Sequence, residues 1–343
     1  MKRLLYILAL GTILTSCERE EGFEGPSLID QFGEFDVVEN LTIANSDVDF
    51  AAGETSFFMA EFSKSVNWEI TITGSSSGAE KVISGSSRIL DEDNASWDGS
   101  TTNLPMFKIE DCDLTLKVSY NVNASDTIIS VIDSLIAEKT ITVSTTKVDS
   151  GLLLADFETG VNPDWEIFAQ SGGNMSFNIA SNNSPQGNSY YDMGGNVDWD
   201  WLIGLVDFPA EAYGNSTFDL NDNGDRVYFN VMLNMPQGLD NPPIVLFQFR
   251  EDDNNNGVFE EGLEDMYSIE IRDLEPGWQL VSLKYSDLAS LVNGAPVDAD
   301  GNGVHNPDLL NKVSVLMLAQ QGLGYSQTLM DYVIFTEDQP LNP

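Results

Sequence analysis

Apolar and polar residues alternate along most of the chain from Glu34 onward. In "DLTLKVSYNV" (113–122), every second residue from Leu114 to Val122 is apolar, and the residues between them are polar. This period of two predicts a half-buried strand, and "VNWEITIT" (66–73) and "KTITVSTT" (139–146) share it. Clusters of Gly, Ser, Asn and Asp separate these strands. Only "TIISVIDSLIAEK" (127–139) and "SDLASLV" (286–292) would suit short helices.

The strands fall into two groups, which predict an all-β protein with two domains. Residues 34–147 have the length and turn spacing of a small two-sheet sandwich. A second unit begins at 148–150 and extends to residue 343. Its loops are longer and richer in Asn, Gly and Asp, which fits a jelly-roll sandwich with decorated loops. We find no heptads, no phosphate-binding glycine loop and no internal repeat.

The first residues have the pattern of an export signal. Lys2 and Arg3 precede an apolar run, Leu4 to Leu14, that is too short for a permanent membrane span. The sequence Leu-Thr-Ser-Cys that ends at Cys17 resembles the lipobox of bacterial lipoproteins. In that family the signal, here residues 1–16, is removed, and the cysteine receives the acyl chains that anchor the protein. The resemblance therefore implies contact with the membrane through a lipid anchor only.

The residues after Cys17 are expected to form a flexible tether over 17–33, because Glu, Gly and Pro dominate there. Arg19, Glu20 and Glu21 resemble the short acidic export tag that sends some lipoproteins to the outer face of the outer membrane. We therefore expect an outer-membrane protein that faces the extracellular side.

Charge and composition exclude several classes of function. The chain has 55 acidic and 15 basic residues and a formal net charge of −40. Nucleic acid is excluded as a partner because phosphate binding needs clustered Lys and Arg. The cations after Gly151 are only Arg226, Arg250, Arg272, Lys284 and Lys312. A sulfated or uronic polysaccharide would therefore be repelled. With one histidine, His305, a Ser-His-Asp hydrolase is improbable, and Cys112 has no cysteine partner once Cys17 is lipidated.

The stretch "GGNVDWDWLIG" (194–204) contains the leading candidates for ligand binding. As a strand, it would place Trp199 and Trp201 on one face, with their Cα atoms roughly 7 Å apart. Asp198 and Asp200 alternate with them. Two flat indoles beside carboxylates suit a sugar, whose C–H face covers a ring while its hydroxyl groups bond to the acids. The alternative is that both indoles pack in the core.

Two further aromatic residues are weaker candidates. Trp165 follows an Asn-Pro-Asp turn and could lie at a loop rim. Tyr190 and Tyr191 would point to opposite faces of a strand, so at most one is available, and Tyr191 is the candidate. Trp68, Trp97 and Trp278 are expected to be structural residues.

Two loops rich in Asp and Asn resemble the start of a calcium-binding EF-hand loop, in which alternate oxygen ligands converge and a glycine makes the turn. In both loops the distal Glu of that motif is replaced by Leu. The candidate ligands are Asp298, Asp300, Asn302 and Asp308 in one loop, and Asp252, Asn254, Asn256 and Glu260 in the other. Calcium is therefore the expected structural cofactor.

Scattered short motifs across nearly the whole chain resemble the surface glycan-binding lipoproteins of polysaccharide-utilisation loci. They include "VNWEITITGSSSGAEKVISGSS", "LADFE", "YYDMGGNVDWDW", "EPGWQLVSLKYSDL" and "DYVIFT". The resemblance implies an Ig-like (PKD-like) spacer sandwich over 34–147 and a carbohydrate-binding jelly roll over 148–343. It also implies a structural calcium shared by Glu158 and Asp331, binding without hydrolysis, and delivery of glycan to an outer-membrane importer.

The resulting hypothesis is a monomeric, non-catalytic surface protein that captures a neutral polysaccharide or oligosaccharide. The glycan is expected to be neutral because cations are scarce near the paired indoles, and a β-glucan such as laminarin is the leading candidate. One alternative is a glycan-degrading hydrolase or lyase, although the spacing of the acids singles out no catalytic pair. Another is a calcium-stabilised structural or adhesive surface protein.

Overall fold

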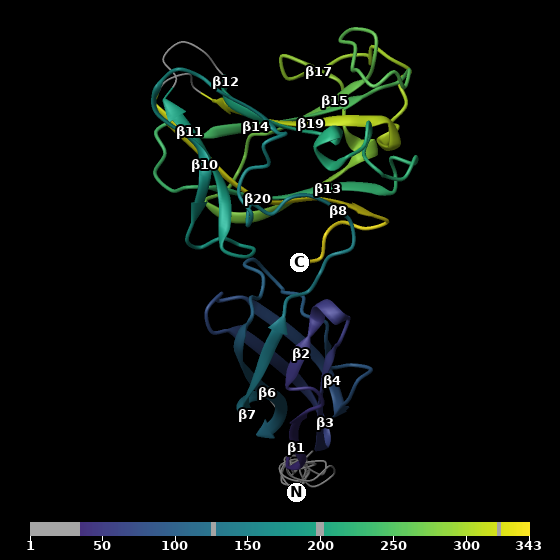
Figure 1. Cartoon of the computed structure of the whole chain (residues 1–343). Coiled ribbons are helices and arrows are strands. Elements are labelled where there is room, and N and C mark those ends of the chain that lie inside the picture. Colours follow the sequence, from purple (N-terminus) through teal and green to yellow (C-terminus); the bar gives the residue numbers. More distant parts are fainter. Residues whose placement is uncertain (1–34, 125–127, 197–201, 321–323) are drawn as a thin grey trace, which may run out of the picture.

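The computed structural model describes residues 35–124, 128–196, 202–320 and 324–343. These residues form strands and short 3₁₀ turns, in two sandwich-like units that are consecutive in the chain (Figure 1). This confirms the all-β class expected from the alternation. Within the described ranges, no helix is long and apolar enough to cross a membrane.

The first unit is one seven-stranded sheet that folds around its own core. Its central strands follow the order β1-β3-β6-β7-β2, with β4 and β5 paired to β3. The last strand of this order, β2, is parallel to β7. The bounds are β1 (Val37–Ile43), β2 (Asp47–Asp49), β3 (Ser56–Gly74), β4 (Glu80–Leu90), β5 (Ser96–Trp97), β6 (Glu110–Ala124) and β7 (Ile128–Thr145).

The period-two pattern of this unit is confirmed in β3 and, as far as Val118, in β6, where Leu114, Leu116 and Val118 are buried. Val66, Trp68, Ile70 and Ile72 of β3 are buried, and the residues between them are half-buried or exposed. Trp97 is also buried, between Phe50 and Phe107. The helix considered for 127–139 is wrong, because Ile128–Thr145 is one long strand paired with β6.

The second unit is a sandwich of two antiparallel sheets, drawn as two layers in Figure 1. The six-stranded sheet has the order β10-β11-β20-β13-β16, with β8 paired to β20, and the five-stranded sheet has the order β15-β14-β19-β12-β9. The bounds are β8 (Leu152–Ala155), β9 (Glu166–Ala169), β10 (Gly173–Ser181), β11 (Ser189–Asn196), β12 (Leu202–Pro209), β13 (Val227–Met235), β14 (Pro243–Glu251), β15 (Met266–Ile271), β16 (Gly277–Lys284), β19 (Leu310–Ala319) and β20 (Tyr325–Glu337).

Phenylalanines fill the space between these two sheets. The ring of Phe229 lies 5.2 Å from those of Phe247, Phe249 and Phe335, all with edge contacts. Such contacts bury a large apolar area. Short elements lie outside the sheets: the 3₁₀ turns η1 (Phe50–Ala52), η2 (Ala210–Tyr213), η3 (Tyr285–Asp287) and η4 (Pro307–Leu309), and the hairpin of β17 (Leu291–Val292) and β18 (Ala295–Pro296). The helix considered for 286–292 is thus replaced by η3 and β17.

The two units contact each other through a small apolar cluster. Met106 of the first unit packs with Met232, Tyr332 and Leu341 of the second. Backbone hydrogen bonds flank this cluster, from Met106 N to the Pro185 carbonyl and from Thr101 N to the Pro343 carbonyl, both at 2.7 Å. Trp278 is half-buried at the edge of the cluster, where its indole N–H donates to the Asn183 carbonyl.

Candidate functional site

The outward face of the five-stranded sheet carries a polar row and an apolar row of side chains. Strand register sets Asp207 beside Glu166 and Ser314, and Ser314 beside Gln248. The next row, two residues along each strand, consists of Phe168, Leu205, Leu316 and Leu246. Because side chains alternate along a strand, these residues point away from the core, which the intervening Val206, Phe208 and Val315 fill. Phe168 is 47% exposed.

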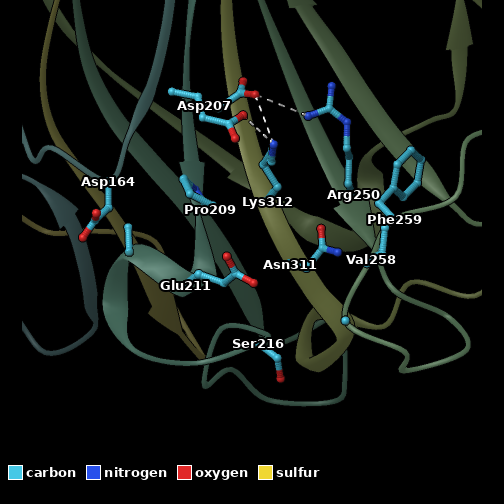
Figure 2. A pocket seen from close by; sticks show the side chains of 13 residues that line it. Asp164, Asp207, Pro209, Glu211, Ser216, Arg250, Val258, Phe259, Asn311 and Lys312 are labelled. Atoms are coloured by element: carbon cyan, nitrogen blue, oxygen red, sulfur yellow. Dashed lines mark hydrogen bonds and ion pairs between the residues drawn. The ribbon is translucent and has the colours of Figure 1, made fainter.

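A cleft of about 680 Å³ opens at the polar end of this face (Figure 2). Four strands of the sheet contribute to it: β9, β12, β14 and β19. The turn η2 and the segment 257–259, which follows β14, form its other walls. Phe259 of that segment lies over the Arg250 guanidinium, 5.9 Å from the ring centroid.

Each cation of the cleft is paired with an acid. Lys312 Nζ lies 2.8 Å from a Glu166 carboxylate oxygen and 3.5 Å from one of Asp207, and Arg250 lies 3.9 Å from Asp207. Figure 2 shows Lys312 and Arg250 converging on Asp207. Hydrogen bonding to Lys312 lowers the pKa of Glu166. The cleft therefore has no unpaired cation among its described residues, which disfavours an anionic ligand.

Two residues of the cleft wall each have a buried hydrogen-bond acceptor with no partner among the described residues. One side-chain oxygen of Asp207 and one of Asn311 are buried without a hydrogen bond in the described structure. Both residues line the cleft. Buried acceptors of this kind are costly unless a water or a ligand satisfies them. Hydroxyl groups are donors that would do so.

The leading sequence candidates cannot be compared with this face. Trp199, Trp201, Asp198 and Asp200 lie outside the described residues. In the chain they come directly before Leu202, the first residue of β12, which is a strand of the cleft sheet.

Two other candidates are corrected by the structure. Trp165 is only 9% exposed and packs edge-on against Phe157 and Phe208 in the core, with its indole N–H 3.1 Å from the Tyr213 hydroxyl. Tyr191 is completely buried and stacks on Phe157. The turn before Trp165 directs the indole inward, and Tyr191 is on the core side of β11. Neither side chain offers a stacking surface.

The predicted calcium loops are brought together, and Asn302 is the one predicted ligand whose side chain takes part. Asp298 and Asp300 are exposed, whereas Asp252 is buried and uses its carboxylate to accept the backbone N–H groups of Asn256 and Gly257. In the same loop, Asn254 bonds to Glu260 at the surface. Asn302 alone reaches across to the other loop, through Asp253. Asp308 has one buried oxygen without a partner.

Glu158 and Asp331 hold the same loop, 184–189. The Glu158 carboxylate accepts the backbone N–H groups of Asn188 and Ser189, both at 2.7 Å. Asp331 is completely buried and accepts the Ser184 hydroxyl at 2.8 Å. Burial raises the pKa of Asp331 to about 8, and the charge of Glu158 adds to the effect. In the part of the chain that the structure describes, no basic side chain forms an ion pair with either acid. This arrangement fits the shared calcium that the family resemblance implies, and this calcium stays a prediction.

The outward face of the sheet is the feature that the sequence analysis missed. A signal was present in "LNKVSVLMLA" (310–319), where Leu316 and Leu318 are apolar at positions that alternate with the core residues. Apolar residues on both faces of a strand indicate that both faces are covered, by the core or by a ligand. The same pattern recurs at Leu246 in β14.

No protein-family model and no curated protein matches this sequence. Among solved structures, the chain is similar to the family 11 carbohydrate-binding module of a cellulosomal cellulase of Clostridium thermocellum, with 14% identity, 56% of this chain and 96% of that chain covered, and a TM-score of 0.37. A structure of carbohydrate-binding modules from the β-sandwich superfamily has 10% identity and a TM-score of 0.37, with 88% of this chain and 98% of that chain covered. The CBM22-1 xylan-binding domain from Paenibacillus barcinonensis has 13% identity and a TM-score of 0.31, with 56% of this chain and 98% of that chain covered. This likeness concerns the sandwich fold alone.

Proposed function

We propose that this chain is a non-catalytic, lipid-anchored surface protein that binds a neutral polysaccharide on the outward face of its five-stranded sheet. The observation that supports this most directly is the apolar row beside the polar row. Phe168 and Leu205 offer a surface for the C–H face of a sugar ring, and Gln248 and Asp207 lie one row away for its hydroxyl groups. The paired charges of Lys312 and Arg250 favour an uncharged chain.

The finer parts of the proposal come from the sequence. Lipidation at Cys17 would place the protein at the outer membrane, and the first unit would act as a spacer. A β-glucan such as laminarin is the proposed ligand, and an outer-membrane glycan importer is the proposed recipient. Calcium at Glu158 and Asp331 would fix the 184–189 loop, which carries Pro185 to its contact with Met106.

Affinity gel electrophoresis in laminarin and other neutral glycans tests the proposal. We expect the wild-type chain to be retarded, and Phe168→Ala to lose roughly tenfold or more in affinity, because one stacking contact is worth about 1–3 kcal/mol. Trp199→Ala is tested in parallel. Ile89→Ala is the matched control, since Ile89 is 48% exposed on the first unit.

Two outcomes would contradict the proposal. If no neutral glycan retards the wild type, the binding function is wrong. If the wild type binds but Phe168→Ala and Gln248→Ala migrate unchanged, the site lies elsewhere. A reducing-end assay after overnight incubation separates a binder from a hydrolase or lyase, because a binder releases no new ends.

A further inference from the structure

A carboxylate occupies a core-facing position at the end of β14. Val245, Phe247 and Phe249 point into the core, and Glu251 continues their alternation. Glu251 is 0% exposed. One of its oxygens accepts the Tyr285 hydroxyl at 2.7 Å and the Asn306 backbone N–H at 2.8 Å. The other oxygen, Oε2, is buried without a hydrogen-bond partner in the described structure.

Two more carboxylates meet Glu251. One carboxylate oxygen each from Glu251, Asp253 and Asp265 lie within 4.8 Å of one another. Asp265 is completely buried and Asp253 is half-buried. The three acids come from the two ends of the 251–265 segment, so the group closes that segment at its base.

The same three acids hold the neighbouring 301–306 segment. The backbone N–H groups of Gly301 and Gly303 each donate to Asp265 at 2.7 Å, and the Asn302 side chain donates to Asp253 at 2.6 Å. A Cβ on Gly301 would lie 2.0 Å from an Asp253 oxygen, so only glycine permits this close approach. Backbone N–H groups therefore border the group on the side of the 301–306 segment.

No basic side chain among the described residues balances this charge. Within the described ranges, no Lys, Arg or His forms an ion pair with any of the three acids. The only nearby histidine, His305, stacks on Tyr267 and uses its Nε2 at the Leu288 carbonyl. Buried charges need a partner, because their desolvation is expensive.

We propose that Glu251, Asp253 and Asp265 bind a calcium ion that fastens the 301–306 segment to the 251–265 segment. All three side chains supply oxygen, the donor atom that calcium prefers, and the unpartnered Oε2 of Glu251 is available for it. Backbone carbonyls and water would complete the coordination. The site is distinct from the loop ligands predicted from the sequence and from the Glu158–Asp331 pair, and it does not depend on glycan binding.

The test counts calcium ions bound to the full chain. The protein is stripped with EDTA, dialysed, and titrated with radioactive calcium in equilibrium dialysis. We expect Glu251→Gln, which keeps the side-chain shape, to lose one bound ion per chain, with a dissociation constant of about 10⁻⁴–10⁻³ M for the lost site. Glu261→Gln is the matched control: it removes the same charge from an exposed position of the same segment and should keep the full count.

Three further variants make the result decisive. Asp331→Asn should lose a different ion, which separates the two sites. If Glu251→Gln fails to fold, Asp253→Asn replaces it, because Asp253 is half-buried. An unchanged ion count in both Glu251→Gln and Asp253→Asn overturns the proposal. Loss of an ion in Asp298→Asn but not in Glu251→Gln also overturns it, since the ion would then lie on the loop predicted from the sequence.

Discussion

At the scale of single residues, Glu110 is a carboxylate that hydrogen bonds hold in its ionised form. It is 8% exposed, at the start of β6. Burial alone would raise the pKa of its carboxyl group. Hydrogen bonds from the Ser77 hydroxyl, the Lys108 backbone N–H and Ser76 outweigh that effect and lower the pKa from 4.5 to about 2. The folded state therefore favours the ionised carboxylate.

This shift predicts a pH dependence of unfolding. Because the pKa of Glu110 is lower in the folded chain, its contribution is complete above about pH 4.5 and disappears as the pH falls towards 2. The difference corresponds to about 3 kcal/mol of unfolding free energy. Urea unfolding at several pH values should show Glu110→Gln to be less stable than the wild type near neutral pH. This difference in unfolding free energy should shrink as the pH falls towards 2. The exposed Glu80→Gln is the control, and a gap constant with pH would refute the assignment.

Single residues also show where sequence reasoning fails. The composition around Trp165 and Tyr191 was compatible with either a rim or a core position. Both side chains pack against Phe157, and this contact places them in the core. For Glu251 the signal existed, because its place in the alternation of β14 is an inward one. An acid at such a position indicates a buried polar site, but its partners on distant segments cannot be read from local sequence.

At the scale of elements, β-strands were predictable where one face is buried and the other is exposed to solvent. The alternation in β3 and β6 specified which side chains enter the core. It failed for 127–139, where apolar residues occur at spacings that suit either element. The β-branched residues Ile128, Ile129, Val131 and Ile132 favour a strand, and pairing with β6 confirms it.

The pairing of β13 with β20 depends on one buried amide. Asn230 is 0% exposed and lies next to a register shift between these strands. Its side-chain N–H group donates to Thr336 at 2.9 Å and to the Ile334 carbonyl at 3.3 Å, and its oxygen accepts the Leu341 N–H at 3.0 Å. The amide therefore joins two strands to the C-terminal segment.

Removing this amide should lower the free energy of unfolding. Asn230→Ala leaves the Leu341 N–H and the Thr336 hydroxyl with fewer partners in a buried place, and each lost partner costs about 1–3 kcal/mol. We expect the second unit to unfold at a lower midpoint concentration of urea, and tryptophan fluorescence measures this unfolding. Asn234→Ala is the matched control, because Asn234 is half-buried on the same strand. Equal midpoints for the two variants would contradict this role.

At the scale of the whole molecule, charge determines how binding responds to salt. The net charge of −40 repels polyanions, and the cations of the cleft are already paired. A neutral glycan releases no counterions when it binds, so its affinity should stay nearly constant between low and high salt. Isothermal titration calorimetry at several salt concentrations measures this. A steep fall in affinity with salt would indicate an anionic ligand instead.

The contact between the two units could not be predicted from the sequence, because it joins residues from distant parts of the chain. Met106 packs with Tyr332 and Leu341, and the Tyr332 hydroxyl donates to Asp149 at 2.9 Å, on the segment that connects the units. Relative motion of two domains is the default unless their contact opposes it. We predict that the apolar packing and the hydrogen bonds on both sides of it limit this motion in solution.

A charge placed inside this contact should separate the units without unfolding either. Met106→Asp puts a carboxylate among the side chains of Met232, Tyr332 and Leu341, and the cost of burying it in this apolar cluster favours an open arrangement. Small-angle X-ray scattering should then give a larger radius of gyration, while circular dichroism stays unchanged. Ile109→Asp is the matched control, since Ile109 lies three residues away and is 70% exposed. If both variants scatter like the wild type, the apolar cluster does not hold the two units together. Another contact would then have to fix the orientation of the second unit relative to the first.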